Sequence, residues 1–323
     1  MFRTEIPSEK PRFNIDMDTN ILSMGSCFAK DIGKRLEDHK LGVDTNPGGI
    51  LFNPLSIFEL MELAHKQHVP AENTFLTHEG IFLNHKFHSE VNGTTESDLR
   101  NQIEAVKKAL RGSLKKANLI ILTFGTAWVY KSKADGALVA NCHKAPQTHF
   151  TKELLTVDEI VIQFGLLKKM IQELNPEVRF LLTVSPVRHI KDTIPLNSVS
   201  KSVLRLACHQ IREQHTEADY FPSYELMMDD LRDYRFYKKD MIHPNEQAVD
   251  YIWQKFIATF FSKSAQSFIH EWAKLKNTMQ HKPFHPVSPA HQQFLKDLIL
   301  KVQNLSEQVD VSKELTALKS QLI

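Results

Sequence analysis

Two continuous apolar runs constrain the fold of this chain more than any other feature. The segments NLIILTFG (118–125) and VRFLLTVSP (178–186) are apolar along most of their length. Strands buried on both faces have this character, whereas a sheet with one solvated face gives alternation. An amphipathic helix, VDEIVIQFGLLKKMIQEL (157–174), lies between the two runs. This order predicts parallel strands joined by helices that cover both faces of one sheet.

Further segments extend the alternation along the chain. ILSM (21–24) predicts a strand, and GVDTNPGGILFNP (42–54) predicts a short strand that runs into a turn. The stretch from about 69 to 97 has no clear periodicity, and we expect it to be irregular. The predicted fold class is α/β, a three-layer domain with a doubly wound, flavodoxin-like parallel sheet. The spacing of apolar residues predicts further helices at about 28–39, 55–68, 96–116, 197–214 and 246–261.

The chain changes character after residue 262. The segment HKPFHPVSP (281–289) contains three prolines, which end any helix there. We predict an α/β domain over 1–262 and a helical extension over 263–323, with a linker at 281–289 and an amphipathic helix at 290–323. Two interpretations of that helix stay open: it packs on its own domain, or it forms a short coiled coil and a homo-oligomer. The apolar residues with 4-3-4 spacing are Leu298, Val302, Leu305 and Val309.

Charge and composition exclude several classes of function. The 323 residues include 40 Lys and Arg against 38 Asp and Glu, so a net charge of +2 gives no field for binding nucleic acid or a membrane surface. The N-terminal segment 1–16 has no apolar core of the kind found in signal peptides. No apolar run approaches the roughly 20 residues that span a bilayer. Three cysteines without a paired motif form no disulfide framework, and we expect a cytoplasmic protein.

Polar residues follow each predicted strand at the point where the strand ends. The carboxyl ends of parallel strands meet at one edge of the sheet, where active sites of doubly wound folds lie. We therefore expect these groups to converge. They are Gly25-Ser26-Cys27, Asn46-Pro47-Gly48-Gly49, Gly125-Thr126-Ala127, the segment from Ser185 to His189, and the segment from Asp240 to His243.

The residues at this edge suit acyl transfer. A serine hydroxyl needs a base that takes its proton, and the base needs an orienting partner. His243 and Asp240 supply both, which makes Ser26 the candidate nucleophile. The N–H groups at Ser26, where a helix begins, and at Gly49 are candidate oxyanion donors. Cys27 is the alternative nucleophile, but neighbours in a tight turn point in different directions, and we expect Cys27 to pack under the helix.

Several blocks of the chain together resemble one protein family over about residues 2–289. They are MGSCFA (24–29), PGGILFNP (47–54), FHS (87–89), TFGTAWVY (123–130), NCHKAPQ (141–147), TVSPVRH (183–189), YFPSYE (220–225) and YRFYKKDMIHP (234–244). The first block resembles the signature of the GSCFA family, a branch of the SGNH (GDSL-like) hydrolase superfamily. The resemblance implies that Ser26 is the nucleophile, that Asp240 and His243 complete the triad, and that Gly49 is an oxyanion donor.

The third block departs from the pattern of that superfamily. SGNH enzymes have Gly-x-Asn-Asp there, with the asparagine amide as an oxyanion donor, whereas this chain has Gly125-Thr126-Ala127-Trp128. Either the Thr126 hydroxyl or the Asn141 side chain replaces the amide, or the oxyanion hole has two donors. The loss of one such donor raises the barrier by roughly 2.7–4 kcal/mol in other enzymes.

The resemblance implies a serine esterase (EC 3.1.1-like) that acts through an acyl–Ser26 intermediate. The expected substrate is an ester, with the acetyl ester of a carbohydrate or small metabolite as the family-level expectation. An acyltransferase with the same triad and a non-catalytic binding protein on this fold are the alternatives. His88, His143 and Arg188 are candidate pocket residues because they belong to family blocks on loops. We expect no metal and no cofactor, since the 16 histidines show no zinc spacing and no Gly-rich phosphate loop occurs.

Overall fold

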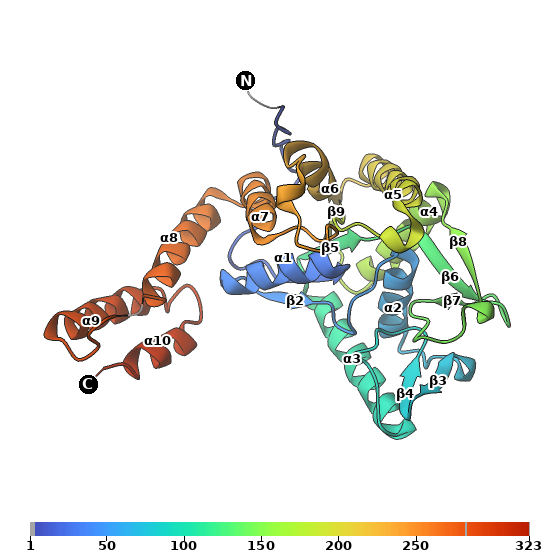
Figure 1. Cartoon of the computed structure of the whole chain (residues 1–323), viewed down its shortest axis with the longest axis horizontal. Helices are drawn as coiled ribbons and strands as arrows, with labels where there is room; N and C mark the ends of the chain where they lie inside the picture. Colours follow the sequence, from blue (N-terminus) through green and yellow to red (C-terminus); the bar gives the residue numbers. More distant parts are fainter. Residues whose placement is uncertain (1–3, 282, 323) are drawn as a thin grey trace.

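A five-stranded parallel sheet forms the centre of the structure, a computed structural model that describes residues 4–281 and 283–322 (Figure 1). The ends of the two predicted domains, at 1–3 and 323, and one residue of the predicted linker, Lys282, lie outside the described residues. The strands lie in the order β10-β9-β5-β1-β2, which is 2-1-3-4-5 in chain order and flavodoxin-like. They are β1 (Ile21–Gly25), β2 (Val43–Thr45), β5 (Leu119–Phe124), β9 (Arg179–Val184) and β10 (Ala218–Tyr220).

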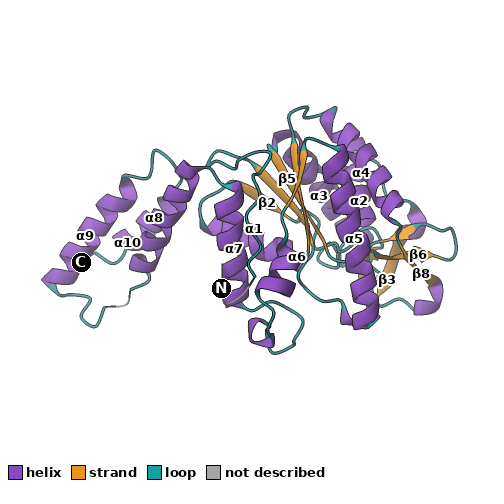
Figure 2. Cartoon of the chain, turned by 90° about the horizontal axis from the view of Figure 1, so that it is seen from above, coloured by secondary structure: helices purple, strands orange, loops and turns teal. Residues whose placement is uncertain are grey.

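Side chains of the central strands alternate between two cores, one on each face of the sheet. In β5, Ile120 and Leu122 pack into one core while Leu119 and Ile121 pack into the other. Figure 2 shows the strands between two helix layers, and the predicted three-layer α/β fold class is confirmed. One layer contains α2 (Pro54–Lys66), α3 (Glu96–Lys116), α4 (Val157–Gln172) and α5 (Ile194–Gln214), and the other contains α1 (Cys27–Asp38) and α7 (Glu246–Phe260).

Two small antiparallel sheets lie beside the central one, and the sequence patterns miss both. The stretch expected to be irregular contains the hairpin β3 (Phe75–His78) and β4 (Ile81–Asn84), and β6 (Trp128–Ser132) pairs with β7 (Leu138–Val139) and β8 (Phe150–Leu154). Sequences such as FLTH in β3 and FTKEL in β8 show neither a continuous apolar run nor a regular alternation. Short helical segments complete the fold: η1 (Glu72–Thr74), η2 (Gln147–His149), η3 (Ile190–Asp192), α6 (Ser223–Glu225), η4 (Leu226–Asp230) and η5 (Tyr234–Phe236).

The C-terminal region is helical and extends to one side of the sheet domain (Figures 1 and 2). It consists of α8 (Lys263–Met279), α9 (Pro289–Gln303) and α10 (Ser312–Lys319). The helix predicted over 290–323 is thus interrupted between 303 and 312, where the polar sequence SEQVD allows a turn. Leu298, Val302 and Leu318 are buried in one core with Trp272 of α8. Homo-oligomer formation through this segment stays a prediction, as does the predicted domain boundary.

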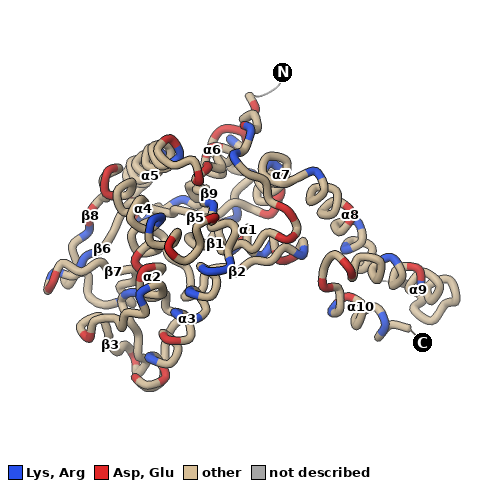
Figure 3. The backbone as a smooth tube through the Cα atoms, turned by 180° about the vertical axis from the view of Figure 1, so that it is seen from behind, with Lys and Arg blue, Asp and Glu red and all other residues tan. Residues whose placement is uncertain are grey.

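No helix in residues 4–281 or 283–322 is long and apolar enough to cross a membrane. Basic and acidic residues are interspersed over the trace in the view of Figure 3, in keeping with the net charge of +2.

Candidate active site

The loop after β2 crosses the carboxyl end of β1 and reaches β5. The Leu51 N–H donates to the Gly25 carbonyl (3.2 Å), and the Gly125 N–H donates to the Phe52 carbonyl (2.7 Å). Gly25 has no room for a side chain, because a Cβ there would lie 2.2 Å from the Thr123 carbonyl oxygen. The crossing brings three of the predicted groups together at the topological switch point between β1 and β5, where ligands bind in such sheets.

Ser26 occupies the N-cap position of α1 with an uncommitted hydroxyl. An N-cap serine usually accepts a hydrogen bond from a backbone N–H of the first helical turn, but Ser26 makes no such bond. Its Oγ is buried without a hydrogen-bond partner among the described residues, and the residue is only 1% exposed. A buried hydroxyl without a partner costs stability, so its presence calls for an explanation, of which a catalytic role is one.

Cys27, the alternative nucleophile, is half-buried at the first position of α1. Burial is the largest influence on its thiol and raises the pKa. Because the thiolate is the nucleophilic form of cysteine, a raised pKa disfavours Cys27 as the attacking group.

Asp240 and His243 form a hydrogen-bonded pair on the loop before α7. His243 Nδ1 lies 2.7 Å from Asp240 Oδ2, and Asp240 Oδ1 accepts the backbone N–H groups of Ile242 (2.9 Å) and His243 (3.0 Å). The hydrogen bond from the His243 N–H, followed by that from Ile242, lowers the pKa of Asp240 to about 2. Met241 takes a left-handed backbone (φ 58°), which closes the turn. The carboxylate therefore stays ionised at neutral pH and orients the imidazole.

Arg188, a predicted pocket residue, supports this same loop. Its N–H and its guanidinium donate to the carbonyls of Ile242 (3.4 Å) and Met241 (3.3 Å), and the guanidinium lies 4.2 Å from the centre of the Tyr237 ring. The side chain is thus engaged in positioning the turn between Asp240 and His243.

Ser26 and His243 lie at the same edge but are not hydrogen bonded to each other. Among the described residues Ser26 Oγ has no partner, and no protein atom bonds His243 Nε2. His243 is close enough to α1 for its charge to act on Asp31, whose pKa burial raises and the charges of Lys238 and His243 oppose. The structure therefore has a hydrogen-bonded Asp–His pair and a serine at the same sheet edge, without a hydrogen bond between the serine and the histidine.

The predicted oxyanion donors are committed to other partners. The N–H of Ser26 donates to the Thr123 carbonyl (3.1 Å), and that of Gly49 donates to the Asn46 carbonyl (2.8 Å). The Thr126 hydroxyl faces α5, 3.0 Å from Ser200 Oγ.

The fourth predicted donor, Asn141, belongs to a different set of loops. Its Nδ2 donates to Ser89 Oγ (3.1 Å), and its Oδ1 accepts the His143 N–H (2.9 Å). Nothing in these contacts directs the amide to Ser26, so the oxyanion role of all four groups stays a prediction.

The two predicted pocket histidines differ in their surroundings. His143 is 5% exposed, with Nδ1 at 3.3 Å from Ser89 Oγ and Nε2 at 2.9 Å from the Asn84 carbonyl, and burial lowers its pKa. It joins two loops. His88 packs on the loop after β2, since a Cβ on Gly49 would lie 2.3 Å from His88 Cβ.

His189 lies next to Ser26, although the sequence interpretation gives it no role. A Cβ on Gly125 would be 3.1 Å from His189 Nε2 and 3.3 Å from Ser26 Cβ, so these two atoms lie close to the same point. Burial, followed by the charge of Lys201, lowers the pKa of His189 to about 4. The imidazole is therefore neutral at pH 7. Its position after β9 was the signal in the sequence that could have identified it.

The Lys201 side chain joins the residues that follow β5 and β9. Its buried Nζ donates to the carbonyls of Gly125 and Ser185, each at 2.7 Å, and burial lowers its pKa to about 7. A lysine in α5 gives no hint of this in the sequence, because the contacts depend on how α5 packs.

Asn46 is a third residue to which the sequence interpretation gives no role, although it places the residue at this edge. Its Oδ1 accepts the Gly25 N–H at 2.7 Å, while its Nδ2 is buried without a hydrogen-bond partner among the described residues. The turn sequence Asn-Pro-Gly-Gly is explained by backbone chemistry alone, and this hides the contact of the amide with β1.

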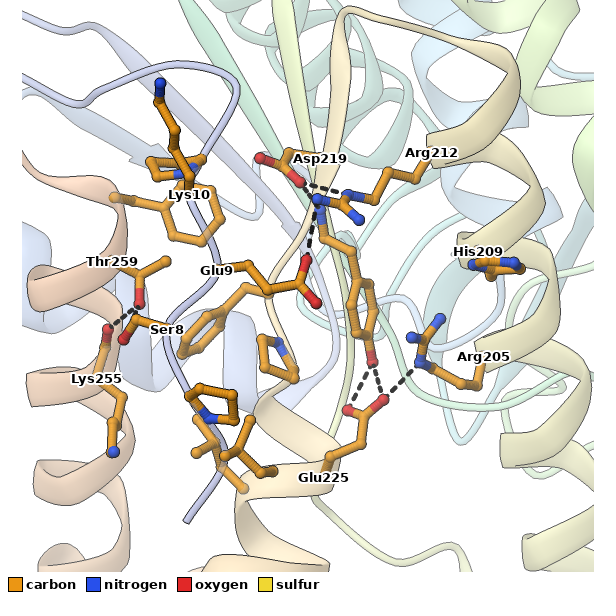
Figure 4. A pocket seen from close by; sticks show the side chains of 18 of the residues that line it. Ser8, Glu9, Lys10, Arg205, His209, Arg212, Asp219, Glu225, Lys255 and Thr259 are labelled. Atoms are coloured by element: carbon orange, nitrogen blue, oxygen red, sulfur yellow. Dashed lines mark hydrogen bonds and ion pairs between the residues drawn. The ribbon is translucent and has the colours of Figure 1, made fainter.

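A cavity of about 360 Å³ lies away from this edge, between the N-terminal segment and β10 (Figure 4). None of the predicted site residues lines it. Two ion pairs among its lining side chains join Arg212 to Asp219 (2.7 Å) and Arg205 to Glu225 (2.5 Å). In the described part of the chain, no group of three or more His, Cys, Asp or Glu residues is placed to hold a metal ion.

Models of known protein families match most of the chain. A family model described as the GSCFA family matches residues 20–256, and a second, described as GSCFA domain protein, C-terminal domain, matches residues 272–323. The first match includes Ser26, Asp240 and His243, and the second runs from α8 through α10. No curated protein matches the chain.

Proposed function

Because the chain belongs to the GSCFA family, we propose that it is a serine hydrolase of the SGNH type that cleaves an ester bond. Ser26 is the nucleophile, His243 the general base and acid, and Asp240 the residue that orients His243. The proposed substrate is a small acyl ester, with the acetyl ester of a carbohydrate or small metabolite as the first class to assay.

One observation carries the proposal. The hydrogen bond of 2.7 Å between Asp240 and His243 lies at the same sheet edge as Ser26, whose buried hydroxyl has no other partner among the described residues. The carboxylate, with its pKa lowered to about 2, holds the proton on Nδ1 and leaves Nε2 as the atom that accepts a proton. A structural serine at an N-cap would instead use its hydroxyl on the helix.

The chemistry follows from these positions. Ser26 Oγ attacks the carbonyl carbon of the ester while His243 Nε2 takes the hydroxyl proton, and the electron pair of the carbonyl moves to its oxygen. The intermediate collapses as the bond to the alcohol oxygen breaks, and His243 gives its proton to that oxygen. Water then attacks the acyl–Ser26 ester with His243 as base, which releases the acid and restores the serine.

Closure of the triad requires a small rearrangement. The bond from Ser26 Oγ to His243 Nε2 is absent here, and such catalytic bonds commonly tighten only when substrate binds. Rotation of the Ser26 side chain about its Cα–Cβ bond is one movement that would redirect this oxygen.

Acyl transfer to an acceptor other than water is the second candidate function. It uses the same triad, and the burial of Ser26, which is 1% exposed, is the observation that favours it, because exclusion of water protects an acyl-enzyme from hydrolysis. A non-catalytic binding protein on this scaffold is the alternative that the experiment below would reveal.

Labelling with a fluorophosphonate probe, located by mass spectrometry, tests the proposal. We expect a phosphonyl group on Ser26 of the wild type, no label in Ser26→Ala, and a label that is lost or strongly slowed in His243→Ala. Ser23→Ala is the matched control. Ser23 Oγ is also buried without a partner among the described residues, but Ser23 lies within β1 and not at the carboxyl end of the strand. Labelling that persists in Ser26→Ala, or that is absent from the wild type, would refute the proposed function.

A further inference from the structure

We propose that the side-chain amide of Asn46 donates a hydrogen bond to the oxyanion that forms when Ser26 attacks an ester, an inference that rests on the proposed function. Asn46 would then supply the donor that the third block of the sequence lacks.

Three hydrogen bonds fix Asn46 at the carboxyl end of the sheet. Its N–H donates to the Ser23 carbonyl (2.8 Å), its carbonyl accepts the Gly49 N–H (2.8 Å), and its Oδ1 accepts the Gly25 N–H (2.7 Å). The backbone is left-handed (φ 47°), a conformation that asparagine tolerates better than most residues. The side chain is therefore held in place before any substrate arrives, as catalysis by preorganised donors requires.

These bonds also decide which end of the amide is free. A backbone N–H can only donate, so the side-chain atom that faces Gly25 is the oxygen, and the nitrogen points away from it. This Nδ2 is buried and has no hydrogen-bond partner in residues 4–281 and 283–322. Buried amide nitrogens normally have a partner, which indicates that a ligand atom or a water completes the site.

The free amide lies close to the proposed nucleophile. Asn46 is bonded to Gly25, and Ser26 is the next residue in the chain, with its own Oγ buried and unpartnered. A carbonyl carbon bonded to Ser26 Oγ would therefore place its oxygen in a region that already contains an uncommitted N–H donor. The hydrogen bond from the amide to the substrate oxygen strengthens as negative charge develops on that oxygen. Because the amide is neutral, it does not attract anions that would compete with the substrate for the site.

The other candidates are less suited to this role. Thr126 and Asn141 face Ser200 and Ser89, and the N–H groups of Ser26 and Gly49 already donate to backbone carbonyls. The Asn46 amide can donate to the oxyanion without first breaking an existing hydrogen bond.

The substitution Asn46→Asp tests the proposal, because it keeps the acceptor for Gly25 and removes the donor. With p-nitrophenyl acetate as substrate, we expect kcat to fall about 10²- to 10³-fold with little change in KM, as for the loss of one oxyanion donor. The matched control is Asn53→Asp on the same loop, where Asn53 caps α2 through its Oδ1 (2.8 Å to the Ser56 nitrogen). Asp caps a helix equally well, so this variant keeps its kcat.

A second readout separates catalysis from positioning. Phenyl acetate and its thionoester analogue differ only in the atom that accepts the oxyanion-hole bond, and sulfur accepts it poorly. The preference for the oxygen ester should shrink in Asn46→Asp, whereas a merely structural defect would slow both substrates equally. If Asn46→Asp unfolds, Asn46→Gly, which keeps the left-handed backbone, should show the same loss.

Each outcome bears on one proposal or the other. Suppose that Ser26→Ala abolishes turnover by the wild type. A kcat of Asn46→Asp within about twofold of the wild type, or an unchanged oxygen-to-sulfur preference, would then overturn the role of Asn46 and leave the proposed function standing. If the wild type has neither Ser26-dependent turnover nor a fluorophosphonate label on Ser26, both proposals fail.

Discussion

Two regions of the molecule use histidine in different ways. In the loop from Lys238 to Asn245, His243 bonds Asp240 through Nδ1 and has no protein partner on Nε2 among the described residues. In the loop cluster formed by residues 84–93 and 141–145, both ring nitrogens of His143 have protein partners, Ser89 and the Asn84 carbonyl. A general base needs one free nitrogen and an oriented ring, and of His243 and His143 only His243 meets both conditions.

Exposure separates the two regions further. The His243 side chain is 36% exposed at the sheet edge, while His143 is 5% exposed within its cluster. A substrate can reach the first imidazole but not the second. Both residues are histidines within the matched GSCFA region, so their partners and access, and not the residue type, distinguish them.

Removal of each imidazole gives the sharpest contrast. We expect His243→Ala to lower kcat for p-nitrophenyl acetate by about 10²- to 10⁴-fold, the usual contribution of a general base. His143→Ala should leave kcat within a few-fold of the wild type, because His143 positions loops and touches no reacting atom. Comparable losses in the two variants would erase the distinction drawn between the regions.

The substitution Asp240→Asn tests what orients His243. The amide no longer holds the proton on Nδ1, so a fraction of the imidazole adopts the wrong tautomer or orientation. We expect a loss of kcat near the lower end of the roughly 10²- to 10⁴-fold range, because the Asp240 side chain is 43% exposed and water can partly replace it. Steady-state kinetics at pH 7 provides the measurement, and full activity in this variant would show that Asp240 is dispensable.

Four of the five strands of the central sheet and most helices could be predicted because their signals are local. The apolar runs at 119–124 and 179–184 and the 3.6-residue spacing of α4 need no knowledge of neighbours. Asp240 and His243 could be paired for the same reason, since three residues of one turn join them.

Asn46 and His189 could not be assigned in this way. Their place beside Ser26 arises because the loop after β2 crosses β1 and because the segment after β9 folds over Gly125, contacts that are distant in sequence. The break between α9 and α10 was not predicted for a related reason: the 4-3-4 spacing continues past the end of α9 through Leu305 and Val309, and packing against α8 decides that the chain turns there.

The neutral imidazole of His189 predicts a pH dependence of stability. Its pKa is about 4 in the folded chain against 6.5 as the ordinary value, so between these pH values the unfolded chain binds more protons. The contribution of His189 to the free energy of unfolding should therefore be fully present above about pH 6.5 and fall progressively as pH falls from 6.5 to 4. The loss reaches up to about 3 kcal/mol and does not grow below pH 4. Urea unfolding at pH 4.5 and 6.5 should show a smaller difference for His189→Gln than for the wild type. Equal differences would mean that His189 titrates normally.

The smallest expected effect concerns stability in the second region. His143→Ala removes hydrogen bonds to the buried Asn84 carbonyl, which keeps the Phe87 N–H as a donor (3.1 Å), and to Ser89 Oγ, and each lost hydrogen bond costs about 0.5–1.5 kcal/mol. His243→Ala breaks a solvent-exposed pair with Asp240, and such pairs contribute about 0–1 kcal/mol. Urea unfolding at pH 7 should therefore rank the two variants in the opposite order from their effect on kcat. A His243→Ala variant that is the less stable of the two would mean that the Asp240 turn maintains the fold as well as orienting the base.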